Sequence, residues 1–348
     1  MEKADIKSFN IIELQDFIEE MGEKKFRAKQ IYEWLHIKLV TDFDDMTNIS
    51  KDLKSKLKER CYITALEPAE VLTSKIDGTQ KYLFRLRDGN VIESVLMKYK
   101  FGNSVCISTQ VGCRMGCRFC ASTLGGLERC LTTSEMLDEI YRIQSITGQR
   151  VSNVVLMGTG EPMDNYDNVV KLVKMLTDEN GLHISGRNIT ISSCGLVENI
   201  MRLADEGLQI TLALSLHASD DDTRKELMPI ANKYTISQIL DACRYYFEKT
   251  GRRVTFEYSL ASGINDTADK ADKLAKLLKG MHAHVNLIPI NPIKERDYKQ
   301  SDKSSITSFK DRLEKNGINV TIRREMGRDI NGACGQLRKS YLETSENL

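Results

Sequence analysis

SVCISTQVGCRMGCRFCAS, residues 104–122, joins a short β-rich run to a loop that contains three closely spaced cysteines. The run covers residues 105–109, and Cys113, Cys117 and Cys120 follow it directly. In α/β folds built from parallel strands, functional residues gather at the carboxyl ends of the strands. This stretch therefore predicts a functional loop at the end of the first strand of such a fold.

The sequence downstream alternates between β-rich runs and helical stretches. Further runs lie at 153–157, 188–192, 210–215, 254–258, 285–288 and 319–322. Helical stretches lie between most of them, at 134–146, 165–176, 237–249 and 267–278. Such alternation is typical of a parallel sheet covered by helices. Because these six or seven units are too few for a closed eightfold barrel, we expect an α/β fold with a partial (β/α)6-type barrel over residues 101–348.

The sequence upstream predicts two smaller parts. Apolar residues from Ile11 to Met21 recur every three to four positions, as in an amphipathic helix, and two more helices are expected around 28–39 and 50–58. Residues 1–60 are therefore expected to form a small helical accessory domain. Residues 61–100 read as short strands with Asp-Gly turns, which predicts a β-rich connecting segment.

Composition narrows the class of protein. No run of about eighteen apolar residues is present, and the N-terminal MEKADIKSFN lacks the apolar core of a signal peptide. We therefore expect a cytoplasmic protein without a membrane span. Nine cysteines in a cytosolic chain indicate metal or redox chemistry more than a disulfide framework.

Charge is informative only locally, because the formal net charge of the chain is +1. Residues 96–130 carry five basic side chains against Glu128, a net +4. The five are Lys98, Lys100, Arg114, Arg118 and Arg129. A solvated basic face is the simplest interpretation of such a run, and a surface for a polyanion such as RNA is the alternative.

The Cys113-x-x-x-Cys117-x-x-Cys120 motif predicts an iron–sulfur cluster. Such clusters normally bind four thiolates on short loops, so three would leave one iron of a [4Fe–4S] cluster open to another ligand. A structural zinc ion prefers a complete set of four ligands, often in two separated pairs, and no second Cys-x-x-Cys pair is present. Inert buried cysteines fit poorly, because Arg114 and Arg118 lie between them.

Five segments together resemble one known family. They are SVCISTQVGCRMGCRFCAS (104–122), MGTGEPMDN (157–165), ALSLHA (213–218), NLIPIN (286–291) and DINGACGQL (329–337). In this order they resemble the RlmN family of the radical S-adenosylmethionine (SAM) superfamily, which methylates adenine C2 in 23S rRNA and tRNA. The resemblance implies a radical SAM barrel and one [4Fe–4S] cluster bound by the three cysteines. It also implies two SAM molecules consumed per methylation.

The resemblance also assigns residues to SAM and to catalysis. The implied SAM-binding residues are Gly160, Glu161, Ser192, Ser215, Leu216, His217 and Asn291. Cys334 matches the cysteine that carries the methyl group, which a radical made from a second SAM then activates for addition to adenine. Cys106 matches the cysteine that resolves the resulting protein–RNA adduct, through a transient disulfide with Cys334.

Glu93 matches the family's proton acceptor, and either Glu93 or Cys106 is expected to remove the C2 proton. The four other cysteines, Cys61, Cys130, Cys194 and Cys243, are interpreted as structural.

The implied partners are 23S rRNA, at its peptidyl-transferase region, and tRNA, beside the anticodon. A flavodoxin or ferredoxin is expected as electron donor, and the protein is expected to be a monomer. The +4 segment and the helical domain become the expected RNA-holding surfaces. A Cfr-like enzyme that methylates C8 is one alternative, although Pro162 stands where that family more often has alanine. A non-catalytic RNA-binding protein with a structural cluster is another, and it would need neither Cys334 nor Cys106.

Overall fold

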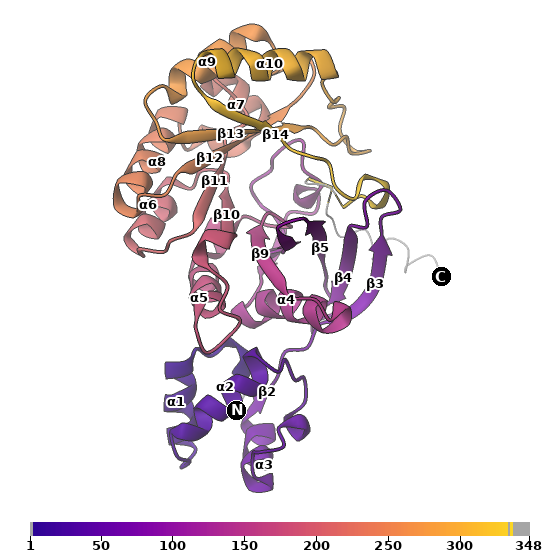
Figure 1. The fold of residues 1–348 in the computed structure, drawn as a ribbon, viewed down its shortest axis with the longest axis vertical. Coiled ribbons are helices and arrows are strands. Elements are labelled where there is room, and N and C mark those ends of the chain that lie inside the picture. Colours follow the sequence, from indigo (N-terminus) through magenta and orange to yellow (C-terminus); the bar gives the residue numbers. More distant parts are fainter. Residues whose placement is uncertain (1–2, 333–334, 337–348) are drawn as a thin grey trace.

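The structure, a computed structural model, describes residues 3–332 and 335–336. Its centre is a ten-stranded sheet of order β14-β13-β12-β11-β10-β9-β6-β5-β4-β3 (Figure 1). Seven neighbouring strands run parallel: β6 (Gly102–Cys106), β9 (Val151–Leu156), β10 (Ile189–Ser193), β11 (Thr211–Ser215), β12 (Val254–Leu260), β13 (Ala283–Pro289) and β14 (Asn319–Ile322). Within the described residues the sheet stays open, because β14 and β3 form its two edges. The predicted partial α/β barrel is confirmed.

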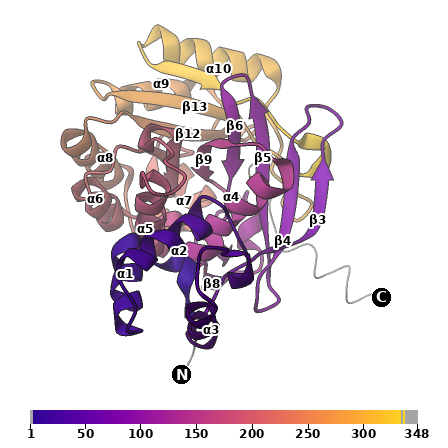
Figure 2. The same cartoon turned by 60° about the horizontal axis from the view of Figure 1, so that its bottom comes forward.

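Helices cover the outer side of the parallel strands (Figures 1 and 2). They are α4 (Thr133–Thr147), α5 (Tyr166–Thr177), α6 (Val197–Asp205), α7 (Asp221–Leu227), α8 (Ile236–Thr250), α9 (Ala268–Leu278) and α10 (Lys303–Lys315). Capping boxes at Thr132 and Thr235 start α4 and α8, and Gly148 and Gly251 end them in the left-handed conformation. The four predicted helices are confirmed. The sequence analysis did not name α6, α7 and α10.

Three antiparallel strands extend the same sheet beyond β6. They are β3 (Glu67–Thr73), β4 (Gln80–Arg85) and β5 (Val91–Tyr99), and β5 pairs with β6. Gly78 and Gly89 adopt φ angles of 73° and 89° in the connecting turns, as the Asp-Gly signals predicted. Most of residues 61–100 thus belongs to the central sheet, whereas β2 at Cys61–Tyr62 pairs with β1, and the domain boundaries at 60 and 100 stay a prediction.

The N-terminal helices pack beneath the sheet's helical layer (Figure 1). They are α1 (Ile11–Glu20), α2 (Phe26–His36) and α3 (Lys51–Arg60), with β1 (Ala4–Asp5) pairing in parallel with β2 (Cys61–Tyr62). The Lys7 ammonium lies 2.5 Å from Asp138 of α4, and both side chains are 1% exposed. Because breaking a buried pair costs several kcal/mol, roughly 3–5, this contact fixes the N-terminal part against the barrel.

Short elements complete the described chain. A small hairpin, β7 (Gln110–Gly112) and β8 (Leu127–Cys130), holds the cysteine loop between its strands. The 3-10 helices are η1 (Ile6–Ser8), η2 (Phe43–Asp45), η3 (Ala121–Thr123), η4 (Pro162–Asn165), η5 (Gly186–Asn188), η6 (Pro229–Asn232) and η7 (Arg328–Ile330). No helix among the described residues is long and apolar enough to cross a bilayer.

Candidate active site

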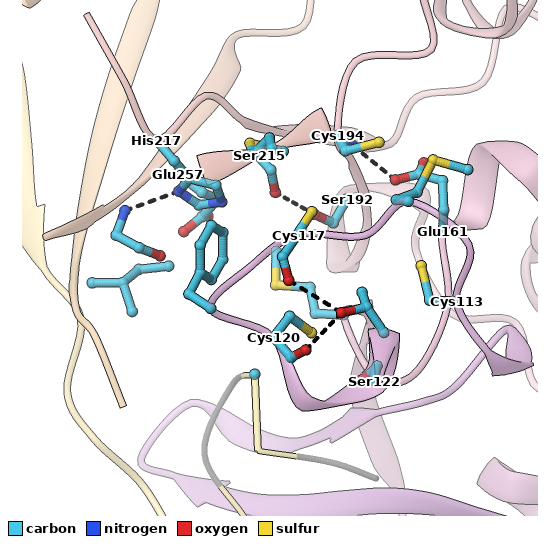
Figure 3. A pocket seen from close by; sticks show the side chains of 18 of the residues that line it. Cys113, Cys117, Cys120, Ser122, Glu161, Ser192, Cys194, Ser215, His217 and Glu257 are labelled. Atoms are coloured by element: carbon cyan, nitrogen blue, oxygen red, sulfur yellow. Dashed lines mark hydrogen bonds between the residues drawn. The ribbon is translucent and has the colours of Figure 1, made fainter. Parts of the chain in front are cut away.

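A pocket of about 1010 Å³, open solvent included, lies at the carboxyl ends of the parallel strands (Figure 3). Nine of the ten residues that the sequence assigned to the cluster and to SAM line it. They are Cys113, Cys117, Cys120, Gly160, Glu161, Ser192, Ser215, His217 and Asn291. Leu216 does not line the pocket, and its side chain is fully buried in the hydrophobic core. The roles of these residues stay predictions.

The cysteine loop is held in one shape by backbone contacts. Gly112 has a φ of 76°, and a Cβ there would lie 1.9 Å from the carbonyl oxygen of Gly126, so the position requires glycine. Cys113 N–H donates to that same oxygen at 2.9 Å, and Arg118 N–H donates to the carbonyl of Leu227 at 2.9 Å. These bonds present the cysteines on a rigid loop that packs against α7.

The three cysteines fit a cluster better than a single ion. Figure 3 shows the three side chains in one pocket, and the Thr123 hydroxyl donates to the carbonyl oxygens of Cys117 and Cys120 at 3.1 and 2.9 Å. Within the described residues, no three His, Cys, Asp or Glu side chains converge closely enough to hold one metal ion. A cluster does not require this, because each thiolate binds its own iron. The residues present therefore fit a [4Fe–4S] cluster.

Burial controls the protonation of these thiols. It raises the pKa of Cys113 to about 12 and that of Cys117 well above its ordinary value. An apolar surrounding disfavours the thiolate, and a bound iron supplies the compensating positive charge. The two sulfurs are therefore neutral without metal and become ligands when iron displaces their protons.

Arg224 adds a positive charge behind the cysteine loop, which the sequence analysis did not foresee. Its side chain is fully buried, and Nη2 donates to the carbonyl oxygen of Cys194 at 2.6 Å. Its Nε donates to the carbonyl of Leu216 at 3.2 Å, while Nη1 has no hydrogen-bond partner among the described residues. A buried guanidinium that meets carbonyls and no carboxylate favours negative charge nearby, here the thiolate of Cys117.

Glu161 ties two strand ends together rather than pointing a free carboxylate into the pocket. One oxygen accepts the N–H of Cys194 at 2.8 Å and the other accepts the N–H of Met163 at 3.1 Å. Burial raises the pKa of Glu161, against the effect of these bonds. Gly160, with a φ of 110°, packs against Thr109 and Gln110, so its lack of a side chain serves the chain's own packing.

His217 lies in the pocket wall, where one ring nitrogen accepts a hydrogen bond and the other is left to donate one. Its Nδ1 accepts the N–H of Ser259 at 2.9 Å, and burial together with Arg224 lowers its pKa to about 3. The ring is therefore neutral near pH 7, with its proton on Nε2. Its backbone has a φ of 56°, an unusual conformation for histidine that is typical of functional sites.

One charged side chain of the wall was missed by the sequence analysis. Glu257 of β12 is 4% exposed, and its carboxylate accepts from Asn286 Nδ2 at 2.9 Å. Burial raises the pKa of Glu257, while Arg323 lowers it. A glutamate inside an otherwise buried strand was the signal that could have identified it, because buried carboxylates need a reason.

A second pocket adjoins the first and contains Cys106. It shares Met157, Ile288, Asn291 and Arg323 with the first pocket. Cys106 lies in β6 opposite Val95, which lines the same pocket. Cys334 lies outside the described residues, but the nearest described residues on either side line different pockets. Gly332 lines the Cys106 pocket and Gly335 lines the cysteine-loop pocket.

Glu93 lies on β5 but lines neither pocket. Its carboxylate is buried 3.4 Å from the ammonium of Lys81, which also donates to the carbonyl oxygen of Asn331 at 3.5 Å. By strand alternation Glu93 faces the same side of the sheet as Val95, a residue of the Cys106 pocket. The structure thus brings Glu93 near the segment that precedes Cys334.

The expected disulfide finds no support in the structure, because no disulfide joins two cysteines among those described. Cys334, the predicted partner of Cys106 in this disulfide, lies outside the described residues. Cys194, interpreted as structural, lines the cysteine-loop pocket.

Two of the five basic side chains in the +4 segment form ion pairs, and the role of this segment in holding RNA stays a prediction. Arg114 pairs with Asp164 at 2.5 Å, and Arg129 pairs with both Asp88 and Glu135 at 2.6 and 2.8 Å. The carboxylates that neutralise these two basic charges all lie outside residues 96–130, the segment for which the charge was counted. Lys98, near the end of β5, and Lys100, in the turn that follows it, remain exposed.

Comparison with known proteins identifies the family. Residues 4–63 match the ribosomal RNA large subunit methyltransferase N-terminal domain, and residues 107–278 match the radical SAM superfamily. A probable dual-specificity RNA methyltransferase RlmN from Lachnospira eligens is 65% identical over 340 residues, covering 98% of this chain and 97% of that protein. Its counterpart from Lachnoclostridium phytofermentans is 64% identical over 342 residues, covering 98% and 96%.

Comparison with solved structures agrees with the sequence comparison. A solved radical SAM methyltransferase from Sphaerobacter thermophilus has a TM-score of 0.93 and 42% identity, covering 97% of this chain and 99% of that chain. The cysteine loop, the pocket at the strand ends and these relatives point to the same chemistry. The chain belongs to the RlmN family of radical SAM RNA methyltransferases, which use a [4Fe–4S] cluster and SAM.

Proposed function

We propose that this protein methylates C2 of an adenosine in the peptidyl-transferase region of 23S rRNA and of an adenosine beside the tRNA anticodon, with Cys334 as the methyl carrier. One observation carries the proposal: the described residues on either side of Cys334 line adjoining pockets. Gly335 lines the pocket of the cysteine loop, and Gly332 lines the pocket of Cys106. A carrier must reach both a methyl donor and a base, and a segment between two such pockets suits that task.

The first pocket would bind the cofactors. Cys113, Cys117 and Cys120 would hold the cluster, which when bound supplies the electron that splits SAM and so generates a radical. The Nε2 proton of His217 suits an acceptor on SAM, and the hydroxyls of Ser192 and Ser215, 3.4 Å apart, suit its polar groups. Gly160, Glu161 and Asn291 are proposed to complete the SAM site, where Glu161 acts by positioning the loop around it.

The second pocket would receive the base. Cys334 is proposed to accept a methyl group from one SAM, and loss of a hydrogen from that methyl makes the carbon reactive toward electron-poor C2. The adduct then joins Cys334 to RNA. We propose that the Cys106 thiolate attacks the Cys334 sulfur, so that the carbon–sulfur bond breaks and a disulfide forms. The released carbon takes a proton to become the methyl group, and the unpaired electron left by the radical addition passes to the one-electron carrier. Glu93 or Cys106 takes the C2 proton, and a cellular dithiol reduces the disulfide.

The decisive test is product identification. Purified protein, reconstituted with iron and sulfide, is incubated with SAM, a reductant and 23S rRNA or tRNA that lack the modification. Mass spectrometry of the nucleosides should show 2-methyladenosine in both RNAs, and Cys334→Ala should yield none. 8-Methyladenosine would identify a Cfr-like enzyme, and SAM cleavage without any methylated RNA would refute the proposal. The flavodoxin or ferredoxin donor and the monomeric state stay predictions.

A further inference from the structure

We propose that the turn between β5 and β6 is a stacking platform for an unpaired RNA base that flanks the target adenosine. The proposal rests on the proposed function and adds the surface that would hold the neighbouring nucleotide. The platform consists of the rings of Tyr99 and Phe101, with Lys98 and Lys100 beside them.

The two rings form a continuous stack that leads from the pocket to the surface. Their centroids are 4.9 Å apart and their planes differ by 7°, a parallel arrangement. Tyr99 lines the Cys106 pocket, whereas Phe101 is 72% exposed. The outer face of Phe101 is therefore an open aromatic surface one ring away from the pocket in which the base would react.

The turn holds Phe101 in a fixed position. Gly102, with a φ of 129°, packs so closely that a Cβ there would lie 2.8 Å from the Ser152 hydroxyl oxygen. Met97 and Met326 pack against Tyr99 and Cys106 in one small apolar cluster. The exposed ring is therefore presented by a rigid support, as an aromatic that binds a base needs to be.

The surrounding charge suits a polyanion. Lys98 and Lys100 are exposed, and Arg324 is exposed at the rim of the same pocket. No carboxylate in the described part of the chain forms an ion pair with any of the three, unlike Arg114 and Arg129. These cations could meet phosphates on both sides of a base stacked on Phe101.

Aromatic rings interspersed with cations are the usual surface for single-stranded RNA. A base that leaves its stack to be modified also unstacks its neighbours, and a protein ring can replace the lost contact. A protein partner would require a wider apolar surface than one exposed ring among lysines. The geometry therefore favours a flanking base as the occupant of this platform.

The test measures RNA affinity with the reconstituted full-length protein and an unmodified tRNA transcript as probe. Phe101→Ala should weaken binding about fivefold or more, as removal of a base-stacking ring does. Ile76→Ala is the matched control, because Ile76 is an apolar residue of another turn and is 71% exposed. Phe101→Trp should keep the affinity, and its fluorescence should be quenched when the transcript binds. The Lys98→Glu/Lys100→Glu variant should show a shallower dependence of affinity on salt.

Production of deoxyadenosine from SAM without RNA reports on the folded active site and should be equal in all variants. The platform would be overturned if the Phe101→Ala variant bound RNA as tightly as the unchanged protein. It would also be overturned if the fluorescence of the Phe101→Trp variant were not quenched by the transcript. Neither result would affect the proposed function. If the unchanged protein binds the transcript but never methylates RNA, the proposed function fails and the platform is still tested by affinity. Equal losses in Phe101→Ala and Ile76→Ala would also overturn it.

Discussion

The ammonium group of Lys81 lies 3.4 Å from the carboxylate of Glu93, and both side chains are buried. Lys81 also donates to the carbonyl oxygen of Asn331, three residues before Cys334. An unpaired buried carboxylate favours its protonated form, so the neighbouring cation suits Glu93 for the role of a base. The pair thus links the proposed proton acceptor to the segment that leads to the proposed methyl carrier.

Lys81→Met should slow RNA methylation, because Glu93 then loses the cation that stabilises its carboxylate. Lys81→Arg should retain most activity. The methylation rate at saturating SAM, compared with deoxyadenosine production without RNA, distinguishes the cases. A folded Lys81→Met variant with an unchanged methylation rate would show that the pair has only a structural role. The Lys81→Met/Glu93→Gln variant should be more stable than Lys81→Met alone, since the buried charge is then removed.

Replacing Cys113, Cys117 or Cys120 with serine should remove the cluster, so the variants should lose colour and deoxyadenosine production. The unchanged protein, purified without oxygen, should contain about four irons and four sulfides per chain. Cys243→Ser is the matched control, because Cys243 is fully buried in α8 and does not line the pocket. Stoichiometric zinc in a colourless, active protein would contradict the cluster.

Much of the fold could be predicted from sequence because strand and helix patterns are local. The expected run 319–322 coincides with β14, and the helix expected at 267–278 differs from α9 by one residue. Helix α10 was not named, because Ile306, Phe309 and Leu313 form a sparse apolar stripe in a charged segment. The sheet continuity of β3–β5 depends on the pairing of β5 with β6, which no local pattern encodes.

The site residues that belong to short sequence motifs could be predicted. Those that reach the site only through the folding of distant segments could not. The cysteines and the Gly-Glu pair were found because they are adjacent in sequence. Arg224 of α7 lies behind the pocket wall and donates to the carbonyl groups of Leu216 and Cys194, and nothing near it in sequence indicates that role. The charge count of the +4 segment missed ion pairs for the same reason, since Asp164, which pairs with Arg114, is fifty positions away.

SAM with a fully deuterated methyl group should yield an RNA methyl that carries two deuteriums and one hydrogen, because one deuterium is removed to activate the carbon. Cys334→Ala should retain its cluster and transfer no methyl. Mass spectrometry of the modified nucleoside measures the label. An intact trideuteromethyl group would mean direct displacement, and the carrier role of Cys334 would be wrong.

His36 should make the protein less stable in mild acid. Its ring is buried between α2 and α4, with Nδ1 against the Tyr141 hydroxyl at 2.9 Å, and burial together with Lys7 lowers its pKa from 6.5 to about 3. Between these values the unfolded chain binds one more proton than the folded chain, so stability falls as pH falls. The slope from this residue is about 1.4 kcal/mol per pH unit near pH 5.

The measurement compares urea unfolding at several pH values between 4.5 and 7. His36→Gln should reduce the pH slope by about 1.4 kcal/mol per unit, corrected for any loss that is independent of pH. His282→Gln is the control, because His282 is exposed. An unchanged slope in His36→Gln would show that other groups cause the acid sensitivity.

Cys106→Ala should still cleave SAM but accumulate a covalent protein–RNA species, because the thiol that releases the adduct is missing. A disulfide requires α-carbons within about 7 Å, so Cys106 and Cys334 must approach each other during turnover. The shared wall of the two pockets and the positions of Gly332 and Gly335 are compatible with that approach. The adduct should appear as a shifted band on a denaturing gel, and Cys106→Ala/Cys334→Ala should lack it. Cys130→Ala, which removes a thiol that lines neither pocket, should turn over normally. If Cys106→Ala also turns over normally, another group releases the RNA and Cys106 is only a residue of β6.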